Sequence, residues 1–109
     1  MGNYQSSEER RLSIHAVLKS INNNCYYNPL ENVKMAYPAI VYKEAEGDMH
    51  YANNNKYFTV EYYTITIISQ NPVEASEILD KVLELPYTEK RASYIQSNLH
   101  HKTVILKTI

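Results

Sequence analysis

The sequence has little of the material from which several common kinds of site are built. It contains one cysteine, Cys25, which excludes an internal disulfide and a cysteine-cluster zinc site and fits a reducing compartment such as a cytoplasm. Only two glycines are present, so a glycine-rich loop that cradles phosphates is not expected. No apolar run approaches the roughly 20 residues that a membrane-spanning helix needs. The polar first thirty residues predict no secretory signal.

Net charge is also nearly absent. Eleven Lys and Arg stand against twelve Asp and Glu, which gives a net charge of −1 and argues against general nucleic-acid binding. The chain is 44% hydrophobic, which is enough apolar material for a core and unlike a disordered chain. A length of 109 residues matches one domain, so we expect a single domain over residues 1–109.

Tyrosine is what the sequence has in excess, with eleven Tyr beside one Phe and no Trp. Tyrosine covers apolar surface while keeping a hydroxyl for a partner, which favours half-buried sheets and interfaces. Three interpretations are open: ordinary sheet packing, a protein interface, and a stacking platform for single-stranded nucleic acid. Glu61 and the single nearby base, Lys56, give the last interpretation little support from charge. The tyrosines concerned are Tyr42, Tyr51, Tyr57, Tyr62 and Tyr63.

Two helices are predicted. The first begins with a capping box at Ser6 and ends at residues 22–24, which are all Asn. The second begins at Asn71-Pro72, where Asn caps and Pro presets the first turn, and is stopped by Pro86. The apolar face of the first comprises Ile14, Val17, Leu18 and Ile21, with Leu12 at its edge. The buried face of the second comprises Ala75, Ile78, Leu79, Val82 and Leu83.

Strands are predicted at residues 39–43, 57–69, 90–96 and 102–109, with an irregular connection at 25–37 and a turn and loop at 44–56. Within residues 57–69 the apolar parity changes from Tyr62 to Ile65, which predicts a β-bulge or a face that changes partner. The order α-β-β-α-β-β predicts an α+β fold. We expect a mainly antiparallel sheet of about four to five strands, with two helices packed on one face.

No arrangement of residues predicts catalysis or a bound cofactor. The adjacent pair His100 and His101 would point to opposite faces of an extended segment, and no third metal ligand lies at a familiar spacing. The three acids of residues 44–48 alternate as calcium ligands would, but Gly47 among them indicates a solvated turn. Cys25 has no basic residue beside it that would depress the thiol pKa. We therefore expect no enzymatic activity, no metal and no cofactor.

Aromatic and proline residues follow a loose pattern along most of the chain. It runs from YPAIVYK at 37–43 and YANN at 51–54 through YTITII at 63–68 and Asn71-Pro72 to LPY at 85–87 and NLHH at 98–101. With a helix preceding this block, the chain resembles the small tail-completion and tail-terminator proteins of long-tailed phages and prophages. The pattern contains no invariant motif.

This resemblance implies a structural subunit that forms a ring, commonly a hexamer, on the last ring of a finished tail tube. The ring would end tube polymerisation and offer the surface for head attachment, with no bond chemistry. It implies as partners further copies of the chain, the tail tube protein and the head connector or head-closure protein, with DNA passing through the ring and no membrane. The location implied is the upper end of the tail in the virion, after assembly in the bacterial cytoplasm. The ring would form either in solution or only on the tail.

Two alternatives stay open. The first is a head-closure or minor tail protein that joins head to tail without length control. The second, of another class, is a small tyrosine-rich module that binds single-stranded nucleic acid. Loop position and aromatic content, rather than any residue carried over from the family, indicate where contacts form. The expected interaction residues are Glu46, Asp48, His50, Tyr51, Asn54, Lys56, Tyr57 and Tyr63.

Overall fold

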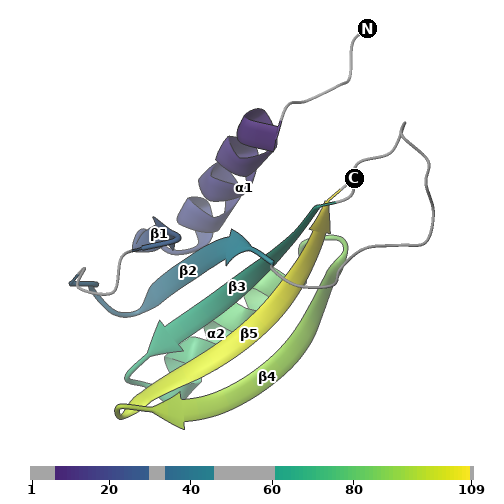
Figure 1. Ribbon diagram of the computed structural model, residues 1–109. Coiled ribbons are helices and arrows are strands. Elements are labelled where there is room, and N and C mark those ends of the chain that lie inside the picture. The colour runs from purple at the N-terminus through teal and green to yellow at the C-terminus, as the bar shows by residue number, and fades with distance from the viewer. Residues whose placement is uncertain (1–6, 30–33, 46–60, 109) are drawn as a thin grey trace, which may run out of the picture.

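The described part of the chain folds as one five-stranded sheet with two helices (Figure 1). The computed structural model describes residues 7–29, 34–45 and 61–108. The sheet has the strand order β1-β2-β3-β5-β4, and its neighbouring strands are antiparallel except for the parallel pair β1 and β2. The elements in chain order are α1 (Ser7–Ile21), β1 (Cys25–Tyr27), β2 (Ala39–Glu44), β3 (Glu61–Ser69), α2 (Pro72–Leu83), β4 (Thr88–Gln96) and β5 (Leu99–Thr108).

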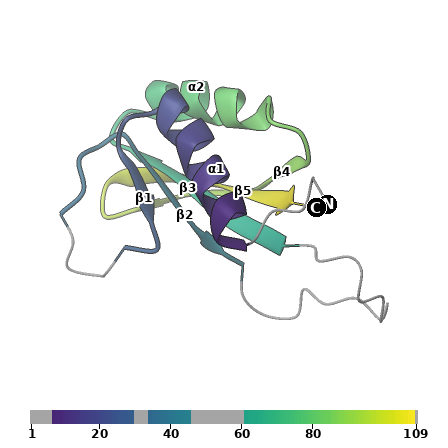
Figure 2. The same ribbon diagram turned by 90° about the horizontal axis from the view of Figure 1, so that it is seen from above.

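Both helices cover one face of the sheet, so the α+β prediction is confirmed. Helix α2 lies against β3 and β5, and α1 lies over the β1–β2 side (Figures 1 and 2). The register places the buried strand residues on that same face, because Tyr42 lies opposite Ile65 and Ile65 lies opposite Val104. The core joins these strands to Ile14 and Leu18 of α1 and to the apolar side of α2.

The sequence-based prediction missed the first strand. Residues 25–37 were expected to be irregular, but Cys25–Tyr27 pairs in parallel with β2, with Cys25 opposite Ile40. The preceding asparagines hold this pairing, since the Ile40 N–H donates to the Asn24 carbonyl at 2.8 Å and Asn22 Nδ2 donates to the Pro38 carbonyl at 2.8 Å. Three residues are too few to show a periodic pattern, which is why the strand escapes notice in the sequence.

The predicted bulge in the long strand is absent from the described part of it. Residues 61–69 pair with β5 in one continuous register, and Tyr63, Ile65 and Ile67 are all fully buried on the helix-covered face. Tyr62, which suggested the parity change, belongs to the opposite face and is half-buried. The register shift lies instead in β4, between Lys90 and Ala92.

The second helix begins where the sequence predicts. The Asn71 side chain accepts hydrogen bonds from the Val73 N–H at 2.8 Å and the Glu74 N–H at 3.3 Å, which satisfies two free donors of the first turn. The helix ends at Leu83, before the expected end at Pro86, and Leu83 is half-buried. The other four residues of the predicted face are buried.

The first helix buries less than predicted. Leu18 is fully buried and Ile14 nearly so, but Val17 is 41% exposed and Leu12 is exposed as well. The buried stripe of α1 is therefore narrower than the spacing of its apolar residues suggests, because α1 lies over the β1–β2 edge of the sheet and not over its whole width. The predicted cap at Ser6 lies outside the described residues.

Strands β4 and β5 form a hairpin. Its turn is Ser97 and Asn98, with φ of 55° and 63°, which is the two-residue geometry that suits the twist of antiparallel strands. The turn is shorter than the expected 97–101, so His100 and His101 lie in β5. In β5 the sequence-based faces are confirmed, with Val104 and Leu106 buried.

Candidate functional site

The interaction residues expected from sequence fall into two groups. Seven of the eight lie outside the described residues: Glu46, Asp48, His50, Tyr51, Asn54, Lys56 and Tyr57. The eighth, Tyr63, is fully buried in the core. The expectation that its ring offers a contact surface is corrected, because Tyr63 shares the helix-covered face with Ile65 and Ile67.

Two of the sheet tyrosines that the sequence singles out are core residues. Tyr42 and Tyr63 are both fully buried, and their ring centroids lie 6.2 Å apart. Tyr62 is half-buried on the other face of β3. A platform that stacks bases needs several exposed aromatic faces. Tyr42 and Tyr63 offer no such exposed face, which favours the packing interpretation for these two residues.

A small polar cluster lies where α1 meets β1 and β2. His15 Nδ1 lies 2.8 Å from the Tyr42 hydroxyl and 3.9 Å from Cys25 Sγ. Burial raises the pKa of the Cys25 thiol to about 11, against the weaker opposing effect of Lys19. A thiol with so high a pKa stays protonated at neutral pH and is a poor nucleophile. The cluster links α1 to the sheet, and its thiol lacks the lowered pKa that activates a cysteine.

Residues 7–29, 34–45 and 61–108 contain neither a cluster of metal ligands nor a helix fit to span a membrane. Within these ranges no group of three His, Cys, Asp or Glu side chains is placed to hold a metal ion. No helix within them combines the length and apolar character needed to cross a membrane.

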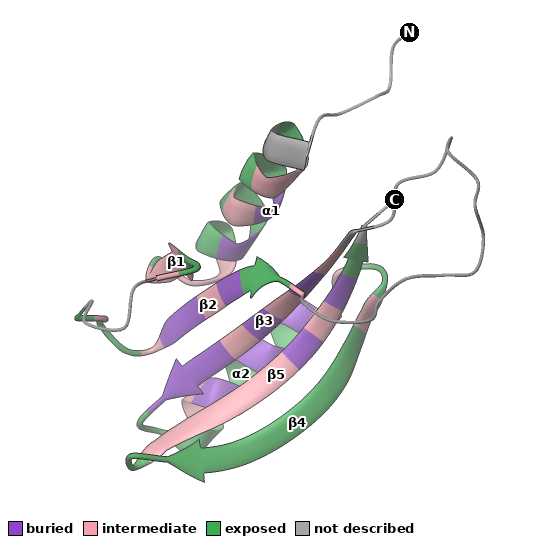
Figure 3. Cartoon of the chain, in the orientation of Figure 1, coloured by how far each residue is buried: buried purple, intermediate pink, exposed green. Residues whose placement is uncertain are grey.

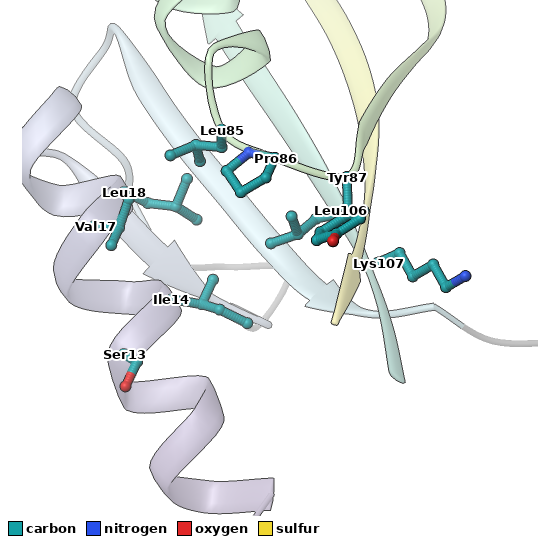
Figure 4. Close-up of a pocket in the computed structure, with 9 residues that line it drawn as sticks. All are labelled: Ser13, Ile14, Val17, Leu18, Leu85, Pro86, Tyr87, Leu106 and Lys107. Atoms are coloured by element: carbon teal, nitrogen blue, oxygen red, sulfur yellow. The ribbon is translucent and has the colours of Figure 1, made fainter. Parts of the chain in front are cut away.

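An apolar groove lies between α1 and the end of the β5 strand (Figure 4). It has a volume of about 410 Å³, and the connection from α2 to β4 forms its third wall. From α1 come Ser13, Ile14, Val17 and Leu18, and from the other walls come Leu85, Pro86, Tyr87, Leu106 and Lys107. The hydroxyl of Ser13 is engaged with the Glu9 carbonyl at 3.1 Å, and Lys107 lies at the rim. The groove thus offers hydrocarbon to a ligand and little that could direct chemistry.

Tyr87 is the unusual residue of the groove. Its φ is 62°, in the left-handed region that a bulky residue avoids at a cost of roughly 1–2 kcal/mol. The surrounding backbone imposes this conformation, because the Lys107 N–H donates to the Tyr87 carbonyl at 3.0 Å and Thr88 Oγ1 donates to the Leu85 carbonyl at 2.9 Å. The side chain is nevertheless 65% exposed. Tyr87 also borders a second hollow of about 400 Å³, which includes Thr88 and Ile105.

The opposite end of the hairpin carries an apolar projection. Strand β4 is exposed along almost its whole length (Figure 3). Next to the turn, Ile95 is 67% exposed and Tyr94 is 45% exposed. The Tyr94 ring stacks on His101 with 4.8 Å between centroids and 8° between planes, so its orientation is fixed. We call Tyr94 and Ile95 the hairpin tip.

Sequence reasoning did not single out the groove or the hairpin tip. Tyr87 and Ile95 look like ordinary loop and strand residues, and Val17 looks like a core residue. One signal was present: Pro86 lies two residues after the C-cap of α2 at Glu84, where proline marks the end of a helix. Exposure of Val17 and Ile95 is decided by which element covers them, and a single sequence does not show that.

Comparison with models of known protein families gives no match for this sequence, and comparison with curated proteins gives none either.

Proposed function

We propose that this chain is a non-enzymatic structural subunit that assembles at the upper end of the tail of a long-tailed phage or prophage. There it caps the tail tube, ends its polymerisation and offers the surface for head attachment. The resemblance in aromatic and proline positions supplies the virion setting. The exposed apolar surface at both ends of the β4–β5 hairpin supports an assembly role.

The observation that carries the proposal is Tyr87. An exposed aromatic ring held at positive φ costs the free chain energy and gains little burial in return. Tyrosine is enriched among the residues that dominate protein interfaces, where a partner covers the ring. Beside it lie an apolar groove and a second hollow that includes the charged side chains of Glu89, Arg91 and Lys107. Binding to another protein would cover the exposed ring and the apolar groove together.

The structure bears differently on the two alternative functions, a nucleic-acid-binding module and a head-to-tail joining protein. A nucleic-acid module would use the tyrosine sheet, and that use loses support because Tyr42 and Tyr63 are buried. A joining role without length control would use the same exposed surfaces as a terminator. Tail length separates those two roles, since only a terminator sets it.

Binding to isolated tail tubes tests the proposal. The purified chain, carrying a gold label, is mixed with tubes of the phage or prophage that encodes it and viewed by electron microscopy. We expect label at one end of each tube, because a cap recognises the terminal ring. Label along the tube wall, or tubes without label, would contradict the proposal. As a control, the Val73→Asp chain should label the tubes as the wild type does, since Val73 is exposed on α2 away from the groove and tip.

A further inference from the structure

The two helices are held on the sheet to different degrees. Helix α1 contributes Ile14 and Leu18 to the core, and it leaves the apolar side chains of Leu12 and Val17 exposed. The shorter helix α2 contributes Ala75, Ile78, Leu79 and Val82. Because apolar burial supplies most of the free energy that holds a helix on a sheet, α1 is the less firmly held of the two.

The flank of α1 that carries Val17 faces open space. Here the groove separates α1 from the α2–β4 connection and the end of β5 (Figure 4). Side chains that border such a space lack neighbours at van der Waals distance, so this flank adds little packing. Two serines of α1 bond within the helix, because Ser13 Oγ donates to the Glu9 carbonyl at 3.1 Å and Ser20 Oγ donates to the Val17 carbonyl at 2.6 Å. Neither hydroxyl proton is used to tie α1 to the sheet.

The end of α1 is anchored by asparagines, independently of the packing of the helix. Asn22 Nδ2 and Asn24 Nδ2 both donate to the Pro38 carbonyl, at 2.8 Å and 3.1 Å. The Ile40 N–H donates to the Asn24 carbonyl at 2.8 Å. Residues 22–24 are therefore tied to the start of β2, at the point where the chain passes from α1 into β1 (Figure 1).

The body of α1 makes one polar contact with the buried interior. His15 Nδ1 lies 2.8 Å from the hydroxyl of Tyr42, which is fully buried in β2. Nearer the start of the helix, Arg11 lies 4.6 Å over the Tyr27 ring, but Tyr27 belongs to the three-residue edge strand β1 and is itself exposed. We call the His15–Tyr42 contact the latch.

We propose that α1 is a hinged helix, which swings away from the sheet about residues 22–24 when the latch parts, while the five-stranded sheet and α2 stay folded. In the described part of the chain, the core cluster draws all its buried residues except Ile14 and Leu18 from β2, β3, β5 and α2, so most of the core persists without α1. Opening removes one wall of the groove and uncovers the Tyr42 ring. The apolar surface that the molecule presents thus changes with the position of α1, whatever the proposed function.

Amide hydrogen exchange, measured residue by residue by NMR at one pH, tests the hinge. A helix of 15 residues is marginal alone in water, so the released α1 also loses its backbone protection. The protection factor of the Leu18 amide should be lower than that of the Ile65 amide, in the centre of β3, by at least about tenfold. The Ile40 amide, which donates to Asn24, should be as protected as Ile65. A Leu18 amide as protected as Ile65 would overturn the opening, and an Ile40 amide as weakly protected as Leu18 would overturn the hinge at residues 22–24.

Two variants separate opening of α1 from unfolding of the whole domain. Tyr42→Phe removes the latch hydrogen bond, and Asn71→Ala removes the cap of α2, outside α1 and the latch. Each loss should raise the population of the globally unfolded chain about fivefold, so both variants should speed exchange at Ile65 by that factor. Only Tyr42→Phe should speed exchange at Leu18 about fivefold.

Equal acceleration of Leu18 exchange by the two variants would overturn the proposal, because α1 would then open only when the whole domain unfolds. A Leu18 amide that Tyr42→Phe leaves unchanged would overturn the role of the latch. The Ile65 amide reports in each variant whether the fold persists. These readouts need no tail, so they and the labelling of tail tubes succeed or fail independently.

Discussion

The hydroxyl of Tyr42 lies 2.8 Å from Nδ1 of His15 and joins α1 to β2 across an otherwise apolar interior. Tyr42 is fully buried, with the Tyr27 ring 5.0 Å away and the Tyr63 ring 6.2 Å away. Above this contact, Arg11 of α1 lies 4.6 Å over the Tyr27 ring. These contacts, with Leu18, fix the helix that forms one wall of the groove.

Replacing Tyr42 by Phe removes the hydroxyl and leaves the ring in place. We expect the free energy of unfolding to fall by about 1 kcal/mol, since a buried hydrogen bond is lost with little change in volume. Urea unfolding measures the difference. Tyr94→Phe, at a half-exposed position, is the control and should change stability by less. An unchanged stability for Tyr42→Phe would show that the contact with His15 contributes nothing.

Stability should decrease at alkaline pH. Burial raises the pKa of Cys25 from 9.0 to about 11, and burial also raises the pKa of Tyr42. Above pH 9 the unfolded chain loses the thiol proton while the folded chain keeps it, so the folded state is disfavoured as pH rises from 9 towards 11. Thermal unfolding across this range measures the decrease, and Cys25→Ala should reduce its slope. A melting temperature that rises over the same range would contradict the account.

The second helix depends on its cap. Asn71→Ala removes the acceptor for two backbone N–H groups and should lower the free energy of unfolding by about 1 kcal/mol. Asn71→Asp keeps the acceptor oxygen and should stay close to the native stability. Chemical unfolding of the three proteins decides the point. Equal losses for Ala and Asp would mean that the amide group, and not the acceptor, matters.

Tyr87 should separate assembly from stability. Tyr87→Gly relieves the positive φ but makes the unfolded chain more flexible, so the free energy of unfolding should change by less than about 1 kcal/mol. Binding to isolated tail tubes should still be weakened, because the exposed ring beside the groove is gone. Tyr87→Ala keeps the strained backbone and should also bind tail tubes more weakly. A glycine variant that labels tube ends like the wild type would show that Tyr87 takes no part in the contact.

The sequence predicts the parts of the fold that depend on neighbouring residues. Asn71-Pro72 specifies a helix start by local chemistry, and the alternation of Val104, Ile105 and Leu106 specifies which face of the strand is buried. Both predictions are confirmed because cap geometry and strand alternation are local rules. The class of the fold follows from the order of such elements.

Features that depend on contacts between residues far apart in the chain could not be predicted from the sequence. The strand at Cys25 exists because β2 lies beside it, and Val17 is exposed because α1 covers only one side of the sheet. Tyr63 was assigned to a surface from its residue type, whereas the register with Leu106 places it in the core. The groove is formed by three segments far apart in the chain, so no window of sequence contains it.

The central claim is that this chain ends the tail tube. Its most direct test is electron microscopy of a lysate from the phage or prophage with this gene deleted, in which tail length and head attachment are scored. Overlong tubes without heads are the predicted result. Tails of normal length lying beside unattached full heads would contradict termination and indicate a joining role, and intact particles would contradict any role at the end of the tail.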